Sequence, residues 1–216
     1  MIVAVDGPAA SGKGTLARAL ASRLGFAYLD TGQIYRAVAA RLLALGRDPP
    51  DEPAAVAAAK ALTHADLDRP GLREEEVAQA ASIVAAIPAV RRALLAFQRD
   101  FARRPPGRTP GAVLDGRDIG TVVCPEAEAK IFVTATPEVR AERRHRELLG
   151  LGRASIYARV LRDMEERDRR DESRAVAPTR PAEDALVLDT SALDAEEVFA
   201  RALAFVRKRR VELGLP

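Results

Sequence analysis

The chain has 216 residues, 48% of them hydrophobic and 30% charged, which is enough to bury one substantial core. Its 34 basic residues barely outnumber its 31 acidic residues, so the charge balance does not indicate a nucleic-acid coat protein. Charges or prolines interrupt every apolar run long before the roughly 20 residues that cross a bilayer, which excludes a membrane-spanning helix. We therefore expect one globular unit.

The chain begins with a predicted strand, a glycine-rich loop and a helix. Residues 2–5 are a short apolar run of mostly β-branched side chains, and Leu16, Leu20 and Leu24 recur at helical spacing after the loop. A glycine then predicts the end of the helix, and residues 26–29 predict a second strand.

The rest of the chain predicts a helical insertion followed by the return of the strands. Residues 31–104 are predicted to be almost wholly helical, because only glycines and prolines break their alanine-rich segments. Short apolar runs return at 112–115, 130–133 and 185–188, with helical patterns between them. Thr136, followed by a proline, predicts a helix start. The expected fold is α/β, a doubly wound parallel sheet of five strands with helices on both faces.

The glycine-rich loop predicts a phosphate-binding site. Gly7, Gly12 and Lys13 have the spacing of a nucleotide-binding P-loop, in the strand-to-helix context that the motif requires. The backbone can curl around phosphate oxygens, and Lys13 can reach the β and γ phosphates of ATP. The loop departs from its commonest form, because Gly14 follows the lysine and the hydroxyl comes at Thr15. A glycine turn without a ligand would make the lysine and the strand coincidental.

Two groups of residues are predicted to contact ATP and its metal. The ATP contacts are Gly7, Pro8, Ala9, Ala10, Ser11, Gly12, Lys13, Gly14 and Thr15, together with Arg143 and Arg144. Asp115 ends a predicted strand, as does the second-motif aspartate of P-loop proteins, so Asp115 and Thr15 are predicted to hold Mg²⁺, directly or through water. A helix-capping aspartate is the alternative interpretation of Asp115.

Arginine predominates among the basic residues and points to the kind of acceptor. Only four of the 34 basic residues are lysines. Arginine's planar fork suits phosphate oxygens, although the codon usage of a GC-rich genome would also enrich arginine. A hydroxyl acceptor usually needs a carboxylate to receive its proton, whereas a phosphate acceptor brings its own anionic oxygen. Arg36, Arg117 and the arginines of 140–174 therefore favour a phosphate acceptor, although about half of the latter fit a solvated, ion-paired surface equally well.

Five segments together resemble bacterial cytidylate kinases. The segments are 7–15, 30–36, 80–85, 115–123 and 166–174. They occur in the family's order and spacing, and the resemblance extends from the first strand to residue 189. The phosphate loop is common to many kinases, whereas the Asp-Gly-Arg-Asp and late Arg-Asp segments are far more selective.

The resemblance implies transfer of the γ-phosphate of ATP to CMP or dCMP, giving ADP and CDP or dCDP. The implied catalytic residues are Lys13, Arg117, Arg167 and Asp115. The implied substrate-binding residues are Thr31, Arg36, Ser82, Arg91, Arg117, Asp118, Arg167, Asp171 and Arg174. Among these, Ser82, Arg91 and Asp118 would face cytosine, whose amino donor and ring acceptors match a carboxylate and a guanidinium.

The resemblance also implies a domain plan. Residues 1–29 and 108–216 would form the P-loop core, and 30–107 a nucleoside monophosphate-binding insertion. Residues 62–76 are too short for the small sheet of many family members, so the insertion is predicted to be helical and trimmed. Residues 144–155, with Gly150 and Gly152 as hinges, are predicted to form a short lid that excludes water.

Two other functions remain open. One is a P-loop kinase for a small hydroxyl metabolite of the shikimate or gluconate type, with Asp30 or Asp118 as the base. The other is a nucleotide-binding regulator without turnover. We expect a cytoplasmic protein, because Cys124 is a solitary cysteine that cannot form an intrachain disulfide. We also expect a monomer, with ATP and CMP or dCMP as its partners and neither nucleic acid nor a membrane.

Overall fold

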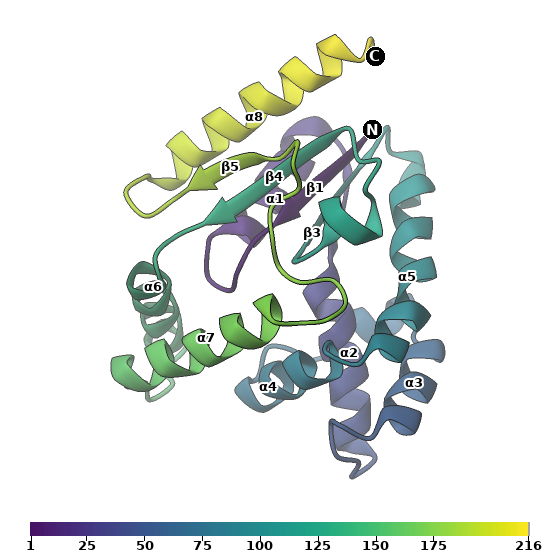
Figure 1. Cartoon of the computed structure of the whole chain (residues 1–216), viewed down its shortest axis with the longest axis vertical. Coiled ribbons are helices and arrows are strands. Elements are labelled where there is room, and N and C mark those ends of the chain that lie inside the picture. Colours follow the sequence, from purple (N-terminus) through teal and green to yellow (C-terminus); the bar gives the residue numbers. More distant parts are fainter. Residues whose placement is uncertain (216) are drawn as a thin grey trace. The chain divides into compact units, whose positions relative to one another are not determined.

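The computed structural model describes residues 1–215 (Figure 1). The strands are β1 (Ile2–Asp6), β2 (Ala27–Asp30), β3 (Ala112–Gly116), β4 (Ala129–Thr134) and β5 (Leu186–Asp189). The α-helices are α1 (Lys13–Leu24), α2 (Thr31–Ala44), α3 (Glu52–Lys60), α4 (Glu75–Val84), α5 (Pro88–Arg103), α6 (Pro137–Gly150), α7 (Tyr157–Glu172) and α8 (Ala195–Glu212). Two 3₁₀ turns, η1 (His64–Asp68) and η2 (Pro106–Arg108), and one π-helical turn, η3 (Ile119–Val123), complete the elements.

The chain divides into two compact units, which we call the core unit and the helical unit. The core unit comprises residues 1–29 and the chain from 102 onward, and the helical unit comprises residues 30–101. The end of α5 belongs to the core unit, because Ala102 is buried and Arg103 pairs with Glu126 at 2.9 Å. The boundary after residue 101 therefore comes earlier than the boundary after residue 107 that we expected.

The sheet of the core unit has the order β2-β3-β1-β4-β5. β1 pairs in parallel with β3 and with β4, and β4 pairs in parallel with β5. The five-stranded parallel sheet predicted from the apolar runs is confirmed, with each strand end displaced by at most one residue. Because later strands add on both sides of β1, the loop after β1 opens at the switch point where such sheets bind ligands.

α1 and α8 cover one face of the sheet, and α8 lies along β5 (Figure 1). Alternate residues of β1, Val3 and Val5, point into this core. The buried residues contributed by the two helices are Leu16, Ala17, Leu20, Ala21, Val198, Ala202 and Val206. Burial of this stripe holds α1, and with it the start of the phosphate loop, against the sheet.

The other face of β1 carries polar chemistry. Asp6 points away from the α1–α8 core, and its carboxylate accepts hydrogen bonds from the backbone amides of Ile119 and Gly120. η3 therefore packs over this face, against β1 and β3. The π-helical turn was not predicted, because no short-range pattern indicates a segment that is held by a distant carboxylate.

The helical unit contains only helices and turns beyond Asp30, as we predicted for residues 31–104. α4 packs along α2, and α3 and η1 also contact α2. Asp30 caps α2 by accepting a hydrogen bond from the Gln33 amide at 3.1 Å. Among residues 1–215, no single helix is long and apolar enough to cross a bilayer; α4 and the segment 88–108 meet that test only as a pair, bent by 100°.

α6 and α7 pack against each other in the core unit. Thr136 caps α6, as predicted, by accepting a hydrogen bond from the Val139 amide. The predicted lid, 144–155, comprises the end of α6, which continues through Gly150, and part of the segment that leads to α7. Of the two expected hinges, only Gly152 has a left-handed backbone, with φ of 70°. α6 extends to Gly150 because the charged and leucine residues before this glycine are strong helix formers.

We predict that Leu20→Ala destabilises the protein by about 2–5 kcal/mol, because it leaves a cavity under β1. Leu20 is fully buried between α1 and the sheet. The measurement is equilibrium urea unfolding. Leu213→Ala is the matched control, since Leu213 is 44% exposed and its loss should cost only about 0.5 kcal/mol. Equal losses in the two variants would contradict this description of the core.

Candidate active site

The phosphate loop connects the end of β1 to the start of α1. At Gly7, φ is 148°, and a Cβ would lie 2.0 Å from the carbonyl oxygen of Val133, so no side chain fits. Gly12 is the N-cap of α1 with φ of 91°, and it brings no side chain to cap the first amides of the helix. Loop and helix start thus present backbone N–H groups and the positive end of a helix dipole, which together form an anion site.

Lys13 and Asp115 meet at the base of this loop. Lys13 Nζ lies 3.8 Å from Asp115 Oδ1, and the Tyr28 hydroxyl donates to Asp115 Oδ2 at 2.7 Å. A Cβ at Gly14 would lie 3.2 Å from the same Oδ2, which gives a physical reason for the glycine after the lysine. Sequence reasoning missed Tyr28. The only signal for it in the sequence was a tyrosine within the predicted strand at 26–29.

Asp115 and Thr15 are the two residues that we predicted to hold a magnesium ion. Asp115 is buried, whereas Thr15 is exposed at the start of α1, and both supply the hard oxygen donors that Mg²⁺ prefers. Residues 1–215 contain no cluster of three or more His, Cys, Asp or Glu that could hold a metal alone. Such a pair suits Mg²⁺, because this ion commonly keeps waters and phosphate oxygens in its shell.

Three predicted arginines converge on Asp171. Arg117 Nε lies 3.1 Å from Asp171 Oδ2 and Arg167 Nε lies 3.9 Å from it, while Arg174 contacts Oδ1. Burial of Asp171 opposes its charge, but the three guanidinium groups outweigh burial and lower the pKa of its carboxyl. The result is a dense positive cluster, and one of its members, Arg117, lies two residues along the chain from Asp115.

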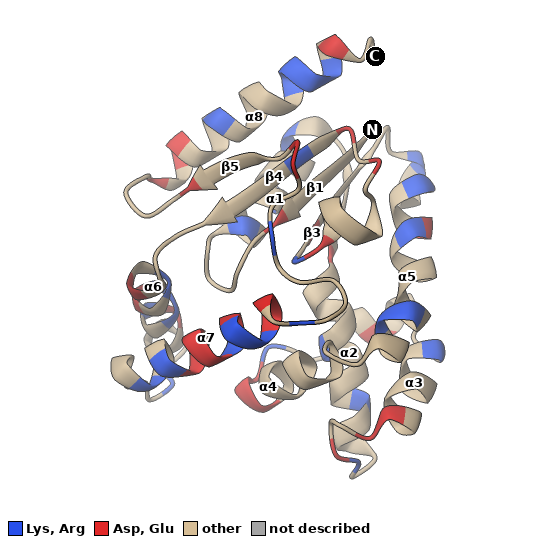
Figure 2. Ribbon diagram, in the orientation of Figure 1, with Lys and Arg blue, Asp and Glu red and all other residues tan. Residues whose placement is uncertain are grey.

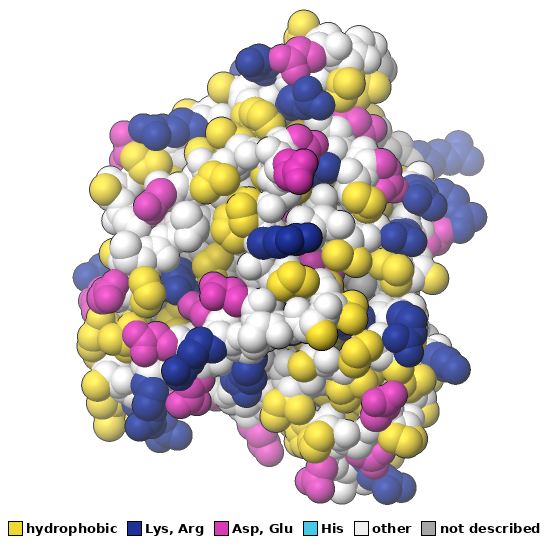
Figure 3. Space-filling model, viewed as in Figure 1, with side chains coloured by type: hydrophobic (Ala, Val, Ile, Leu, Met, Phe, Trp, Pro, Cys, Tyr) yellow, Lys and Arg dark blue, Asp and Glu magenta, His cyan; other side chains and the backbone are white. Residues whose placement is uncertain are grey.

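The remaining arginines of α6 and α7 divide into buried and exposed groups. Figure 2 shows acidic and basic residues close together along α7. Arg146 and Arg159 are 74% exposed and pair with Glu142 and Asp163 on their own helices. On the face shown in Figure 3, charges of both signs are interspersed among apolar side chains. Exposed pairs of this kind contribute little to stability.

The two α6 arginines that we predicted to contact ATP have protein partners. Arg143 donates from Nη1 to Thr190 Oγ1 at 2.9 Å and to the Ser11 carbonyl at 3.4 Å. Its Nη2 donates to the Thr190 carbonyl at 2.7 Å. Arg144 pairs with Glu147 at 2.9 Å. Arg143 thus lies beside the phosphate loop, and Arg144 is held on its own helix.

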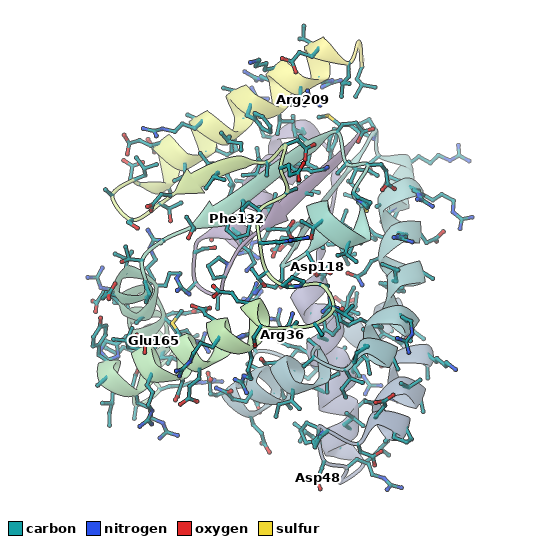
Figure 4. The ribbon with its side chains drawn as sticks, viewed as in Figure 1. Arg36, Asp48, Asp118, Phe132, Glu165 and Arg209 are labelled. Atoms are coloured by element: carbon teal, nitrogen blue, oxygen red, sulfur yellow. The ribbon has the colours of Figure 1, made fainter. Side chains whose placement is uncertain are left out.

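Asp118 and Asp6 flank the start of η3. Asp118 is the N-cap residue of η3, 5% exposed, at the end of the segment that follows β3 (Figure 4). Burial, together with repulsion from Asp118 and Asp115, raises the pKa of Asp6 to about 7, although the amides of Gly120 and Ile119 oppose the rise. Sequence reasoning gave Asp6 no role; an acidic residue at the end of an apolar strand was the available signal.

The helical unit holds the other predicted substrate residues. Arg36 Nη2 lies 2.7 Å from Asp30 Oδ2, one turn into α2, and Thr31 is buried beside the cap. Figure 4 labels Arg36 on this helix. A Cβ at Gly32 would lie 3.0 Å from Asp30 Oδ1, so a larger residue would crowd this pair.

Two further predicted residues lie on α4 and α5. Arg91 stacks over the Tyr35 ring, 5.5 Å from its centroid, and donates to the Ala85 carbonyl at 3.1 Å. Ser82 is 3% exposed, and its Oγ has no hydrogen-bond partner. A buried hydroxyl without a partner is costly, and a bound ligand would relieve that cost.

The parallel sheet and the glycine loop at its switch point define a P-loop kinase. Two solved structures share the fold at low identity. A gluconokinase from Sinorhizobium meliloti 1021 aligns with a TM-score of 0.52 and 18% identity, over 98% of this chain and 94% of that one. An uncharacterized protein from Eubacterium ventriosum aligns with a TM-score of 0.54 and 12% identity, over 96% of this chain and 98% of that one.

Sequence comparison shows the family. Residues 3–208 match the family model for cytidylate kinase. A cytidylate kinase from Paramagnetospirillum magneticum is 62% identical over 209 residues, 97% of this chain and 99% of that protein. Another from Rhodospirillum rubrum is 61% identical over 203 residues, 94% of this chain and 95% of that protein. This chain belongs to the cytidylate kinase family, as its motifs had indicated.

Asp6 predicts a pH dependence of stability. The folded-state pKa of about 7 lies above the ordinary value of 3.8, so the folded protein binds this proton more tightly than the unfolded chain does. The free energy of unfolding should therefore fall as pH rises from about 4 to 7, by roughly 3–4 kcal/mol, and then level off. We expect the free energy of unfolding of the wild type minus that of Asp6→Asn, from urea unfolding, to fall by about the same amount over that range. A difference independent of pH would contradict the prediction.

Proposed function

We propose that the protein transfers the γ-phosphate of ATP to CMP or dCMP, giving ADP and CDP or dCDP. The observation that carries this proposal is the cluster of Arg117, Arg167 and Arg174 around Asp171, in the same unit as the phosphate loop. Bacterial relatives at 55–62% identity over nearly the whole chain bear the name cytidylate kinase, which supports this choice of acceptor.

The chemistry requires charge compensation more than proton removal. Donor and acceptor are both polyanions, and the attacking phosphate oxygen is already ionised, so no carboxylate base is needed. Lys13 would bind the β and γ phosphates of ATP, while Arg117 and Arg167 would hold the acceptor phosphate and the group in transfer. Prearranged cations of this kind stabilise developing charge without reorganising during the reaction.

Asp115 and Thr15 would hold Mg²⁺, and Lys13 would be oriented by its contact with Asp115. Bound magnesium would supply charge neutralisation between the β and γ phosphates. Tyr28 donates to the other oxygen of the same carboxylate, Asp115 Oδ2, and so helps to fix its orientation. Asp115 would therefore both orient Lys13 and help to hold the magnesium ion.

We assign recognition of the base to Asp118, Arg91 and Ser82. Cytosine presents an amino donor beside two acceptors, which match a carboxylate, a guanidinium and a hydroxyl. The unpartnered Ser82 hydroxyl and the burial of Asp118 support this assignment. Uracil would turn a carbonyl oxygen toward the carboxylate, and a buried unpaired acceptor is a strong means of rejection.

The proposal also assigns residues to the sugar, to the acceptor phosphate and to the lid. Asp171 would contact the ribose or deoxyribose hydroxyl, and Thr31 and Arg36 would serve the phosphate side of the acceptor. The helical unit would be the acceptor-binding insertion, and residues 144–155 would act as the lid. We propose a monomer that works in the cytoplasm, where its single buried Cys124 needs no disulfide partner.

A kinase for a small hydroxyl metabolite is the less favoured alternative. Its general base would be Asp30 or Asp118, but Asp30 is already occupied by its pair with Arg36 and by the helix cap. The likeness to a gluconokinase supports a shared fold and nothing about the acceptor. A regulator without turnover would have no use for the retained Lys13–Asp115 pair.

The direct test is ADP release with ATP, Mg²⁺ and a panel of CMP, dCMP, UMP, shikimate and gluconate. We expect strong turnover with CMP and dCMP only. Lys13→Met should lower kcat/KM for CMP by at least about 10²–10³-fold, because a transition-state contact is lost. Turnover with a small alcohol and none with CMP would overturn the proposed function, and full activity of Lys13→Met would reject the role of Lys13.

A second prediction concerns the choice of base. Asp118→Asn should lower the ratio of kcat/KM for CMP over UMP by about 10²-fold or more, because an amide can donate to uracil's carbonyl. The KM for ATP should change little. Asp48→Asn, an exposed position, is the matched control and should leave the ratio unchanged. Intact discrimination in Asp118→Asn would show that another group reads the base.

A further inference from the structure

Arg140 of α6 is a buried arginine with no role in the chemistry described above. It is 3% exposed, and each nitrogen of its guanidinium has a different acceptor. Nε donates to the Ala135 carbonyl at 2.9 Å, Nη1 to the Ala9 carbonyl at 3.3 Å, and Nη2 to Asp168 Oδ2 at 2.6 Å. One side chain thus connects the end of β4, the phosphate loop and α7.

Arg140 contacts Ala9 in the middle of the phosphate loop, and we call Ala9 and Ala10 the crest of this loop. Ala10, the next residue, has φ of 56°, a left-handed backbone that costs energy for a residue with a Cβ. A strained conformation persists only when its surroundings hold it. The loop crest therefore needs external support, and the Arg140 hydrogen bond supplies part of it.

Apolar contacts from the same helix pair add to this support. Ala9 and Ala10 pack against a small buried cluster formed by Ala141 of α6 with Val160 and Met164 of α7. The crest of the loop thus lies against the α6–α7 pair through both polar and apolar contacts. Movement of either helix would change the position of the loop backbone.

The geometry explains why this position has an arginine. Arg140 donates to its three acceptors from three separate nitrogens of one planar group, whereas a lysine has a single donor nitrogen. Its charge is balanced by Asp168, which is itself largely buried, so the pair is costly to break from one side. Because Nη1 engages a loop carbonyl from outside, it helps to fix the neighbouring amides that would face phosphate.

We propose that Arg140 is a positioning residue, which together with Asp168 fixes the crest of the phosphate loop and couples the α6–α7 pair to ATP binding. It acts through the Ala9 carbonyl, not by touching the nucleotide. The inference rests on the proposed function only in taking the loop as the ATP site. It is independent of the identity of the acceptor, and its test uses ATP binding alone.

The test is calorimetric titration of the full chain with a non-hydrolysable ATP analogue and Mg²⁺. Arg140→Met should weaken binding at least tenfold, and Arg140→Lys should restore less than half of that loss on a logarithmic scale, because a lysine keeps the charge but not the fork. Arg146→Met is the matched control: Arg146 lies on the same helix and pairs with Glu142 at 2.7 Å, but it is 74% exposed. The Arg146→Met variant should bind the ATP analogue with wild-type affinity.

Amide hydrogen exchange provides the readout that separates positioning from general stability. Exchange in a peptide that covers residues 6–16 should accelerate in Arg140→Met, while the β3 and α8 peptides keep wild-type rates. If Arg140→Met does not fold, Asp168→Asn decides the matter, since it retains an acceptor for Nη2 and removes only the charge. It should weaken binding at least threefold and accelerate exchange in the same peptide.

Affinity within twofold of wild type in a folded Arg140→Met, or in Asp168→Asn if the first variant does not fold, would overturn the inference. Full rescue by Arg140→Lys would do the same, because it would mean that charge alone matters. Failure of the proposed function looks different: the wild type would bind the ATP analogue but would not phosphorylate CMP or dCMP.

Discussion

Three guanidinium groups lie close together in this protein because all three pair with one buried carboxylate, that of Asp171. Without that anion, mutual repulsion would drive Arg117, Arg167 and Arg174 into solvent, and no dense positive cluster would exist before substrates arrive. The same attraction keeps the pKa of Asp171 low despite its burial. A kinase that brings two polyanions together depends on this kind of arrangement, because its cations must be in place in advance.

Other buried carboxylates in the core unit organise the backbone and the side chains around the phosphate loop. Asp115 pairs with Lys13, and Asp6, at the end of β1, holds η3 through its backbone amides. Asp168 balances the charge of Arg140, which contacts the phosphate loop. Each removes a polar group from water and recovers the cost through hydrogen bonds or a paired charge. The loop is thus supported from the sheet side and from the α6–α7 side.

Local sequence patterns were sufficient for most of the fold. The strand, loop and helix at the N-terminus follow from a β-branched run, the glycine spacing and leucines four residues apart, and Thr136 marked the start of α6 correctly. The patterns failed where distant groups decide the local structure. η3 depends on Asp6, which lies more than a hundred residues away in the sequence.

The order of residues along the chain was enough to establish the phosphate loop, the parallel α/β class and the family, because these depend on short spacings and on which side chains suit a strand or a helix. Only the folded chain decided which arginines share a carboxylate and which lie in solvent. Arg140 and Arg146 illustrate this: they are six residues apart in one helix, yet one is buried against the loop and the other is exposed. Their different roles come from contacts with segments far away in the chain, which no local spacing encodes.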